Sequence, residues 1–188
     1  MKSTVDKKII GFDMDGVIID HTKNKIRAAK KFGVLVKKEQ TPSMLIRKYF
    51  SPSDYEKFRN HLYDHVASIH KPDLMPEVKK TLSSIRKNKI PFYLISRQKY
   101  PQKAIGVLNY YDLWPKYFNE KNTYFVKEVE DKETKAKELG ITHYIDDEQK
   151  VLDALASVKN KFLFDVLDVF KDSPYKRLSS WKEISNLI

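Results

Sequence analysis

The sequence predicts an α/β fold with a parallel sheet. From residue 90 onward, short apolar segments alternate with segments of helical periodicity, a pattern typical of βαβ units. Residues 90–96 form a continuous apolar run, which favours a strand buried on both faces of a sheet. A third observation is that the first apolar run, residues 8–12, is separated from the others by the helix-patterned residues 21–89, which we interpret as a helical insertion.

The composition is that of a globular protein. The chain has 188 residues, of which 41% are hydrophobic and 32% charged, so we expect one domain with an inserted subdomain. Cysteine is absent, which excludes disulfides and thiolate metal sites and fits a reducing cytoplasm, the localisation that we expect. The start lacks the apolar core of a signal peptide, and no run approaches the length of a membrane span.

The charge balance is strongly basic. Lys and Arg number 36 against 25 Asp and Glu, which gives a net charge of +11. Such a charge favours polyanions such as nucleic acid, or steers small anionic substrates. The lysines are spread along the chain and do not form a tail, so a solvated basic surface is the plainer interpretation.

The first strand ends in two carboxylates. Asp13 and Asp15 follow the apolar run, and Gly16 then permits a turn. Alternate residues of a strand share a face, and parallel sheets bind ligands beyond the carboxyl ends of their strands. Two like charges held this close favour a hard cation such as Mg²⁺ or a proton on one carboxyl.

The insertion is expected to contain several helices. The first covers residues 21–36 and closes near Gly33, and Thr41-Pro42-Ser43 starts the next. A further helix begins at Ser51 and continues at helical spacing to Ile69, and another follows Pro76. Its aromatic residues could stack on a base, although aromatics at helical spacing usually belong to a core.

The remainder reads as strands and helices in alternation. Strands are expected at residues 90–96, 124–126, 141–145 and 161–164, and helices at 101–111, 132–139, 151–158 and 179–188. Ser96 and the pair Asp146 and Asp147 end two of these strands, so parallel pairing would bring them to the same sheet edge as Asp13 and Asp15. Carboxylates around Mg²⁺, with a lysine and a hydroxyl, can bind and stabilise a phosphoryl group in transfer.

These segments resemble the sequence motifs of the haloacid dehalogenase (HAD) superfamily. Residues 12–20 (FDMDGVIID) resemble its first motif, and residues 92–96 (FYLIS) the second. Lys132 fits the third motif, and residues 144–147 (YIDD) are similar to the fourth in its paired-aspartate form. The resemblance implies a Rossmann-like three-layer α/β core with a parallel sheet, formed by residues 1–20 and 90–188, and an α-helical cap at residues 21–89.

The resemblance also implies roles for single residues. Asp13 would be the nucleophile that forms an aspartyl-phosphate, and Asp15 the general acid and base. Asp13, the backbone carbonyl of Asp15, Asp146 and Asp147 would hold Mg²⁺. Ser96, Arg97 and Lys132 would bind the phosphoryl group. Because Asp15 is present, the chain looks like a phosphatase and not a dehalogenase.

Several alternatives stay open at this stage. Lys127 and Lys135 compete with Lys132 for the role of catalytic lysine. The expected reaction is hydrolysis of a small phosphomonoester, a nucleotide or a sugar phosphate, but a phosphomutase would use the same site. A basic nucleic-acid-binding module on the same scaffold is a hypothesis of another class.

His61 and His65 share a helix face but have no acidic companion, so we expect ordinary surface histidines. The oligomeric state is not predicted.

Overall fold

The computed structural model describes residues 8–187, and its centre is a six-stranded parallel sheet. The strand order is β5-β4-β1-β6-β7-β8. These strands are β1 (Ile10–Phe12), β4 (Phe92–Arg97), β5 (Thr123–Val126), β6 (His143–Asp146), β7 (Asn160–Phe164) and β8 (Lys176–Leu178). The prediction of a parallel α/β sheet is thus confirmed, and β1 lies between β4 and β6, where its end meets the ends of both neighbours.

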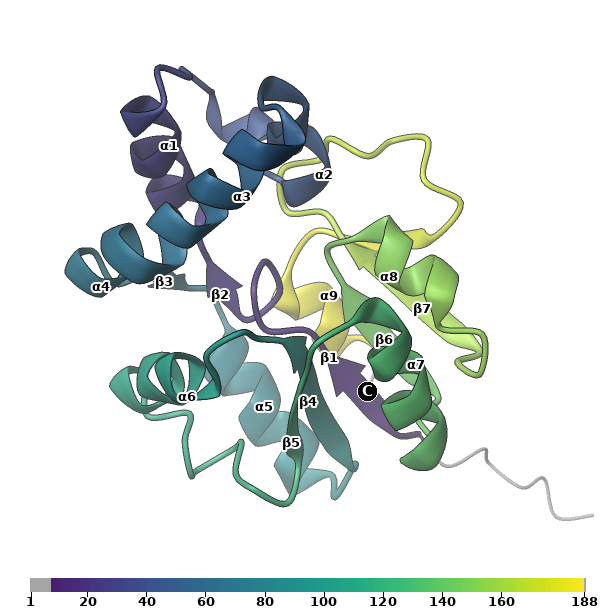
Figure 1. Cartoon of the computed structure of the whole chain (residues 1–188). Helices are drawn as coiled ribbons and strands as arrows, with labels where there is room; N and C mark the ends of the chain where they lie inside the picture. The colour runs from purple at the N-terminus through teal and green to yellow at the C-terminus, as the bar shows by residue number, and fades with distance from the viewer. Residues whose placement is uncertain (1–7, 188) are drawn as a thin grey trace, which may run out of the picture.

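Helices cover both faces of this sheet, which gives three layers (Figure 1). α5 (Val78–Lys87), α6 (Pro101–Tyr110) and α9 (Trp181–Ser185) share one buried cluster with the sheet, and α7 (Val129–Glu138) and α8 (Gln149–Ala154) share a second. Strand β4 serves both clusters by alternation, since Leu94 belongs to the first and Ile95 to the second. This explains why residues 92–95 are apolar without interruption.

The last helix is fixed to the first strand. Ser180 caps α9 by accepting a hydrogen bond from the backbone N–H of Glu183, and the following Trp181 is 1% exposed. Its ring stacks on Phe12 with centroids 5.1 Å apart, and Nε1 donates to the carbonyl of Val17 at 2.7 Å. The end of the chain therefore supports the loop that follows β1.

The helices between β2 (Ile19–Asp20) and β3 (Asp73–Leu74) form a separate group on one side of the sheet (Figure 1). They are α1 (Thr22–Lys31), α2 (Ser43–Ile46), α3 (Pro52–His61) and α4 (Ala67–Ile69), with 3₁₀ turns at Lys38–Gln40 and Arg47–Tyr49 and a π turn at Leu62–Val66. This group has a buried cluster of its own around Ala28, Phe58 and Leu62.

The chain enters and leaves this helical group through β2 and β3, which pair antiparallel. α5 follows β3 and packs in the cluster of the sheet through Val78, Leu82 and Ile85. We propose that the cap is the segment between β2 and β3. The boundary expected at residue 89 would then move back to about residue 72, because α5 packs with the core.

Three details differ from the sequence prediction. The first helix ends at Lys31, and Gly33 has φ = +72°, so residues 34–36 lie outside it. The strands β2, β3 and β8 are only two or three residues long and were not predicted, and helix α8 ends at Ala154, before the expected residue 158. Among residues 8–187, none of the helices has the length and apolar character needed to cross a membrane.

Candidate active site

The predicted site residues meet at the carboxyl ends of the central strands, around one cavity. Its lining includes every residue that the sequence suggested, namely Asp13, Asp15, Ser96, Arg97, Lys132, Asp146 and Asp147. Asp13 directly follows β1, and its backbone N–H donates to the carbonyl of Ile145 in β6 at 3.0 Å. This bond sets the end of β1 beside Asp146, the last residue of β6.

Lys132 binds the two carboxylates that face each other there. It lies in the first turn of α7 and is 2% exposed. Its Nζ donates to Asp13 Oδ1 at 2.6 Å and to Asp146 Oδ2 at 2.8 Å. Burial works against its charge, but Asp13 and then Asp146 hold the pKa of the ammonium group well above its usual value. Of the three candidate lysines, Lys127 is exposed and Lys135 pairs with Glu138, so only Lys132 reaches these aspartates.

Asp15 has different partners. Its Oδ1 lies 3.0 Å from His21 Nε2, and its Oδ2 accepts a hydrogen bond from Gln98 Nε2 at 3.0 Å. Burial favours the neutral acid, but His21 and then Gln98 outweigh it, so the pKa of Asp15 lies below its ordinary value. Asp15 is therefore held as a carboxylate in this arrangement.

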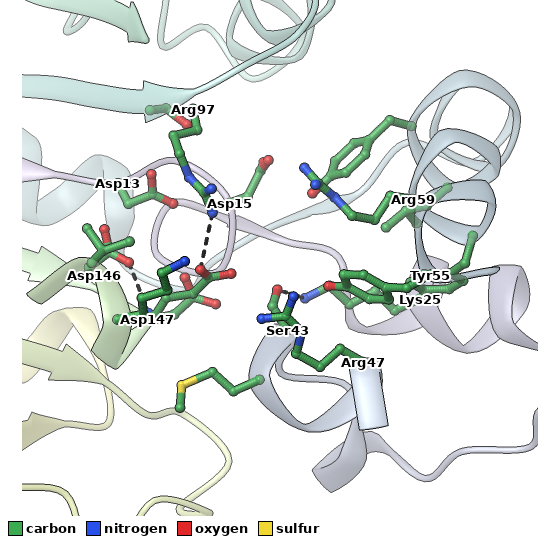
Figure 2. Close-up of a pocket in the computed structure, with 18 of the residues that line it drawn as sticks. Asp13, Asp15, Lys25, Ser43, Arg47, Tyr55, Arg59, Arg97, Asp146 and Asp147 are labelled. Atoms are coloured by element: carbon green, nitrogen blue, oxygen red, sulfur yellow. Dashed lines mark hydrogen bonds and ion pairs between the residues drawn. The ribbon is translucent and has the colours of Figure 1, made fainter. Parts of the chain in front are cut away.

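Strand β4 contributes Ser96 and Arg97. Ser96 is 1% exposed, and its Oγ lies 3.4 Å from Gln98 Nε2. The Arg97 guanidinium donates a hydrogen bond to Glu148 Oε2 at 3.2 Å, and Figure 2 marks an interaction of the labelled Arg97 with a dashed line. Both side chains line the cavity, and Arg97 could bind an anion only in competition with Glu148.

Three carboxylates are close enough to hold a metal ion. One oxygen each of Asp13, Asp146 and Asp147 lies within 4.8 Å of the others. Burial, then Glu148 and Asp146, raises the pKa of Asp147 well above its usual value, which shows how unfavourable the crowded negative charge is. Hard divalent cations take such oxygen ligands and relieve this repulsion, so the donor set fits Mg²⁺.

Gly16 makes room for the third of these carboxylates. It has φ = +87°, and a Cβ at this position would lie 2.3 Å from Asp147 Oδ2. Any larger residue would both strain the backbone and displace Asp147. The glycine of the first motif is therefore required by the geometry of the aspartate group.

The pKa of the Asp13 carboxyl is raised by its surroundings. Burial raises its pKa, Lys132 opposes the rise, and the neighbours Asp146 and Asp15 add to it, with a result of about 7. The pKa of Asp146 is raised as well, again chiefly by burial. Without a cation, the site thus holds protons that isolated carboxyls would lose.

The helical group forms the opposite wall of the cavity (Figure 2). Its polar contributions were not predicted as site residues, and they are Lys25, Ser43, Arg47, Tyr55, Arg59 and Tyr63. His21 and Gln98, the partners of Asp15, were missed too. Periodicity indicates that Tyr55 and Tyr63 lie on a helix, but it does not show which helix face looks toward the sheet. Phe58, by contrast, is a core residue at 1% exposure, as aromatics at this spacing usually are.

Comparisons with known proteins agree with this arrangement. The family model of the 5′ nucleotidase, deoxy (pyrimidine), cytosolic type C protein (NT5C) matches residues 7–188. No curated protein sequence shows a significant match.

Among solved structures, a predicted phosphatase from Clostridium acetobutylicum is similar with a TM-score of 0.69 and 15% identity, over 96% of this chain and 97% of that one. A HAD family hydrolase from Deinococcus radiodurans R1 with bound phosphate and sodium gives 0.65 and 16% identity, over 95% and 93% of the two chains. A HAD hydrolase of family IA, variant 3, from Entamoeba histolytica gives 0.65 and 15%, over 94% of each. These likenesses show the fold, and the family match covers almost the whole chain. The chain therefore belongs to the NT5C family, and it is a phosphatase of the haloacid dehalogenase superfamily.

Proposed function

We propose that this phosphatase is a Mg²⁺-dependent phosphomonoester hydrolase that acts through an aspartyl-phosphate on Asp13. The observation that carries the proposal is the position of Asp13. Its carboxylate accepts a hydrogen bond from the Lys132 ammonium group at 2.6 Å and has an oxygen within 4.8 Å of oxygens of Asp146 and Asp147. A nucleophile needs this combination, because Lys132, together with a cation that the three carboxylates would hold, would offset the charge of the incoming phosphoryl group.

The first step transfers the phosphoryl group to the protein. An Asp13 oxygen forms a bond to phosphorus while the ester P–O bond breaks, and Asp15 gives a proton to the leaving oxygen. Lys132 and Ser96 bind the phosphoryl oxygens, and Arg97 joins them when it leaves Glu148. When bound, Mg²⁺ supplies further positive charge beside the reacting group, held by Asp13, Asp146, Asp147 and the backbone carbonyl of Asp15.

The second step releases inorganic phosphate. Asp15 takes a proton from a water molecule, whose oxygen attacks phosphorus and displaces the Asp13 carboxylate. The lowered pKa of Asp15, which His21 and Gln98 maintain against burial, suits this role as a base. For the first step Asp15 must carry a proton, and His21 Nε2, 3.0 Å away, is the neighbouring group that can share one.

The substrate class follows from the family and from the second wall of the cavity. The matching family is named for 5′ nucleotidases of pyrimidine deoxynucleotides, so these monophosphates are the first candidates, with sugar phosphates next. The rings of Tyr55 and Tyr63 line the cavity and could stack on a base. We place the enzyme in the cytoplasm on the family's cytosolic type and the absence of cysteine.

The test is release of inorganic phosphate from deoxythymidine and deoxyuridine 5′-monophosphates with Mg²⁺ or EDTA. We expect turnover with Mg²⁺ only, and a loss of about 1,000-fold or more in kcat for Asp13→Asn. Asp112→Asn, at an exposed site away from the cavity, should keep full activity. Full activity of Asp13→Asn would rule out this nucleophile, and isomerised substrate without free phosphate would indicate a mutase.

A further inference from the structure

The carboxylates that line the cavity all lie on its sheet side, whereas cations lie on both sides. These carboxylates come from the end of β6 and from the segments that follow β1 and β6, namely Asp13, Asp15, Asp146, Asp147 and Glu148, and the same side supplies the cations Arg97, Lys132 and Lys150. Among the described residues, the helical group between β2 and β3 supplies cations to the lining and no carboxylate. These cations are Lys25 of α1, Arg47 of the 3₁₀ turn before α3, and Arg59 of α3.

Within residues 8–187, none of the three cations is in direct contact with a carboxylate, although Lys25 is near enough to Asp15 and Asp147 to oppose a rise in the pKa of both. Lys25 donates a hydrogen bond to the neutral hydroxyl of Ser43 at 3.3 Å, and the Arg47 guanidinium lies over the Tyr55 ring, 5.3 Å from its centroid. Arg59 has no ion pair there either. Figure 2 shows Lys25, Arg47 and Arg59 extending from the helices toward the side where the aspartates lie.

The reacting phosphoryl group does not account for these cations. The groups proposed to bind it lie on the sheet side, and they are Lys132 and a Mg²⁺ ion that the three clustered carboxylates could hold. The other end of a nucleoside or sugar monophosphate is uncharged, so it would offer no negative group to Lys25, Arg47 and Arg59, of which the two arginines are exposed and Lys25 is half-buried. A planar guanidinium that stacks on an aromatic ring keeps its N–H edge free for bidentate binding of an oxyanion.

We propose that the preferred substrate carries a second anionic group, remote from the phosphoryl group that is removed, and that Lys25, Arg47 and Arg59 bind it. The chemical class is a bisphosphorylated metabolite, either a nucleoside with phosphates on two hydroxyls or a sugar with phosphates at both ends. The proposal rests on the proposed function, since it names the substrate class of the same site.

The experiment compares substrates that differ only in the second phosphate. One pair is deoxythymidine 5′-monophosphate and deoxythymidine 3′,5′-bisphosphate, and the other is fructose 6-phosphate and fructose 1,6-bisphosphate. Phosphate release by the wild type with Mg²⁺ gives kcat/KM for each compound. Calorimetric titration of Asp13→Asn with the same compounds and Mg²⁺ gives each Kd without turnover, so the binding comparison stands even if hydrolysis fails.

We expect the second phosphate to lower Kd and KM by at least about tenfold in one pair, equivalent to about 1.4 kcal/mol. The pair that shows the gain identifies the nucleoside or the sugar as the scaffold. In the double variant Arg47→Gln/Arg59→Gln the ratio between the two members of that pair should fall to about one. Lys48→Gln, an exposed neighbour outside the lining that removes the same unit of charge, should keep the full ratio.

Either of two results would overturn the proposal. In the first, the second phosphate lowers Kd by less than about threefold in both pairs, or raises it. The second is a gain that survives in the double variant, because other groups would then bind the phosphate. Failure of the proposed function looks different, since neither member of a pair would release phosphate while the Kd ratio would still be measured.

Discussion

We expect Lys132 to contribute to the stability of the folded protein as well as to the proposed reaction. Its ammonium group is buried between Asp13 and Asp146, which are themselves 7% and 1% exposed. In Lys132→Met both carboxyls would lose their cationic partner and would either stay charged at a cost or take up protons. We expect the free energy of unfolding in EDTA at pH 7, measured by urea denaturation, to fall by about 3–5 kcal/mol.

Lys135→Met is the matched control on the same helix. Lys135 pairs with Glu138, which is 58% exposed, and surface pairs of this kind contribute about 0–1 kcal/mol. If Lys132→Met cost no more than this control, the two hydrogen bonds of Lys132 would have little energetic weight.

Asp13 should make the metal-free protein less stable as the pH rises. Burial, opposed by Lys132 and reinforced by Asp146 and Asp15, raises its pKa from 3.8 to about 7 in the folded state. The folded protein therefore keeps a proton that the unfolded chain releases, and raising the pH through this window favours unfolding. In EDTA, the loss of stability between about pH 5 and about pH 8 should be smaller in Asp13→Asn than in the wild type, by on the order of 2 kcal/mol.

The measurement is a series of urea midpoints in EDTA across this range, with Asp112→Asn as control because its carboxyl is 83% exposed. Parallel curves for the wild type and Asp13→Asn would show that Asp13 ionises normally in the folded state. Added Mg²⁺ should flatten the wild-type curve, because a cation bound to the folded state favours the ionised carboxyls.

The sequence predicts these residues to different degrees. The position of Asp13 and Asp15 at the end of the first strand is predictable, because an apolar run precedes them, one residue separates them and a glycine follows. The sequence narrows the choice of catalytic lysine to three candidates. Only the rotation of α7 about its axis shows that Lys132 is the one that contacts Asp13. His21 and Gln98 were missed, because their hydrogen bonds to Asp15 depend on the path of two loops that no periodicity describes.

At the scale of elements, the N-terminus of α3 offers a local test. Ser51 has an extended backbone and accepts a hydrogen bond from the backbone N–H of Asp54 at 3.2 Å, with Pro52 in the first turn. Ser51→Ala should cost about 1 kcal/mol. Since α3 carries Tyr55 and Arg59, amide hydrogens of this helix should exchange about fivefold faster by mass spectrometry, while those of the sheet should be unchanged.

Ser51→Asn is the control for this variant, because asparagine caps helices as well as serine does. Equal exchange in Ser51→Ala and wild type would mean that packing around Phe58, and not the cap, determines the stability of α3.

Helices with strong start signals were the easiest elements to predict. The segment from Ser51 to Ile69 is continuous helix as expected, but the π turn at Leu62–Val66 within it leaves no sequence signature. β2, β3 and β8 were missed because strands of two or three residues contain too little alternation to detect. Such strands form because a neighbour offers unpaired backbone groups, which is a tertiary effect.

For the whole molecule, alternating segments predict a parallel sheet but not its strand order. The order β5-β4-β1-β6-β7-β8 puts the first strand at the centre, which brings the most distant motifs of the sequence, Asp13 and Asp146, together. The extent of the proposed cap is harder to predict from the sequence. α5 is amphipathic like the helices between β2 and β3, and only the packing of Val78 and Leu82 against the sheet supports our proposal that it belongs to the core.

The net charge of +11 also acts on the scale of the whole molecule, and it leads to the last prediction. A positive field attracts an anionic phosphomonoester to the cavity, and salt screens this attraction. Raising NaCl from about 20 mM to about 500 mM should therefore increase KM several-fold, while kcat changes by less than about twofold, because the reacting groups are buried beside Asp13. Oligonucleotide binding, measured in the same salt series by fluorescence anisotropy, should vanish near physiological salt. If binding persisted there while KM was insensitive to salt, the basic surface would serve a nucleic acid and not the steering of a small substrate.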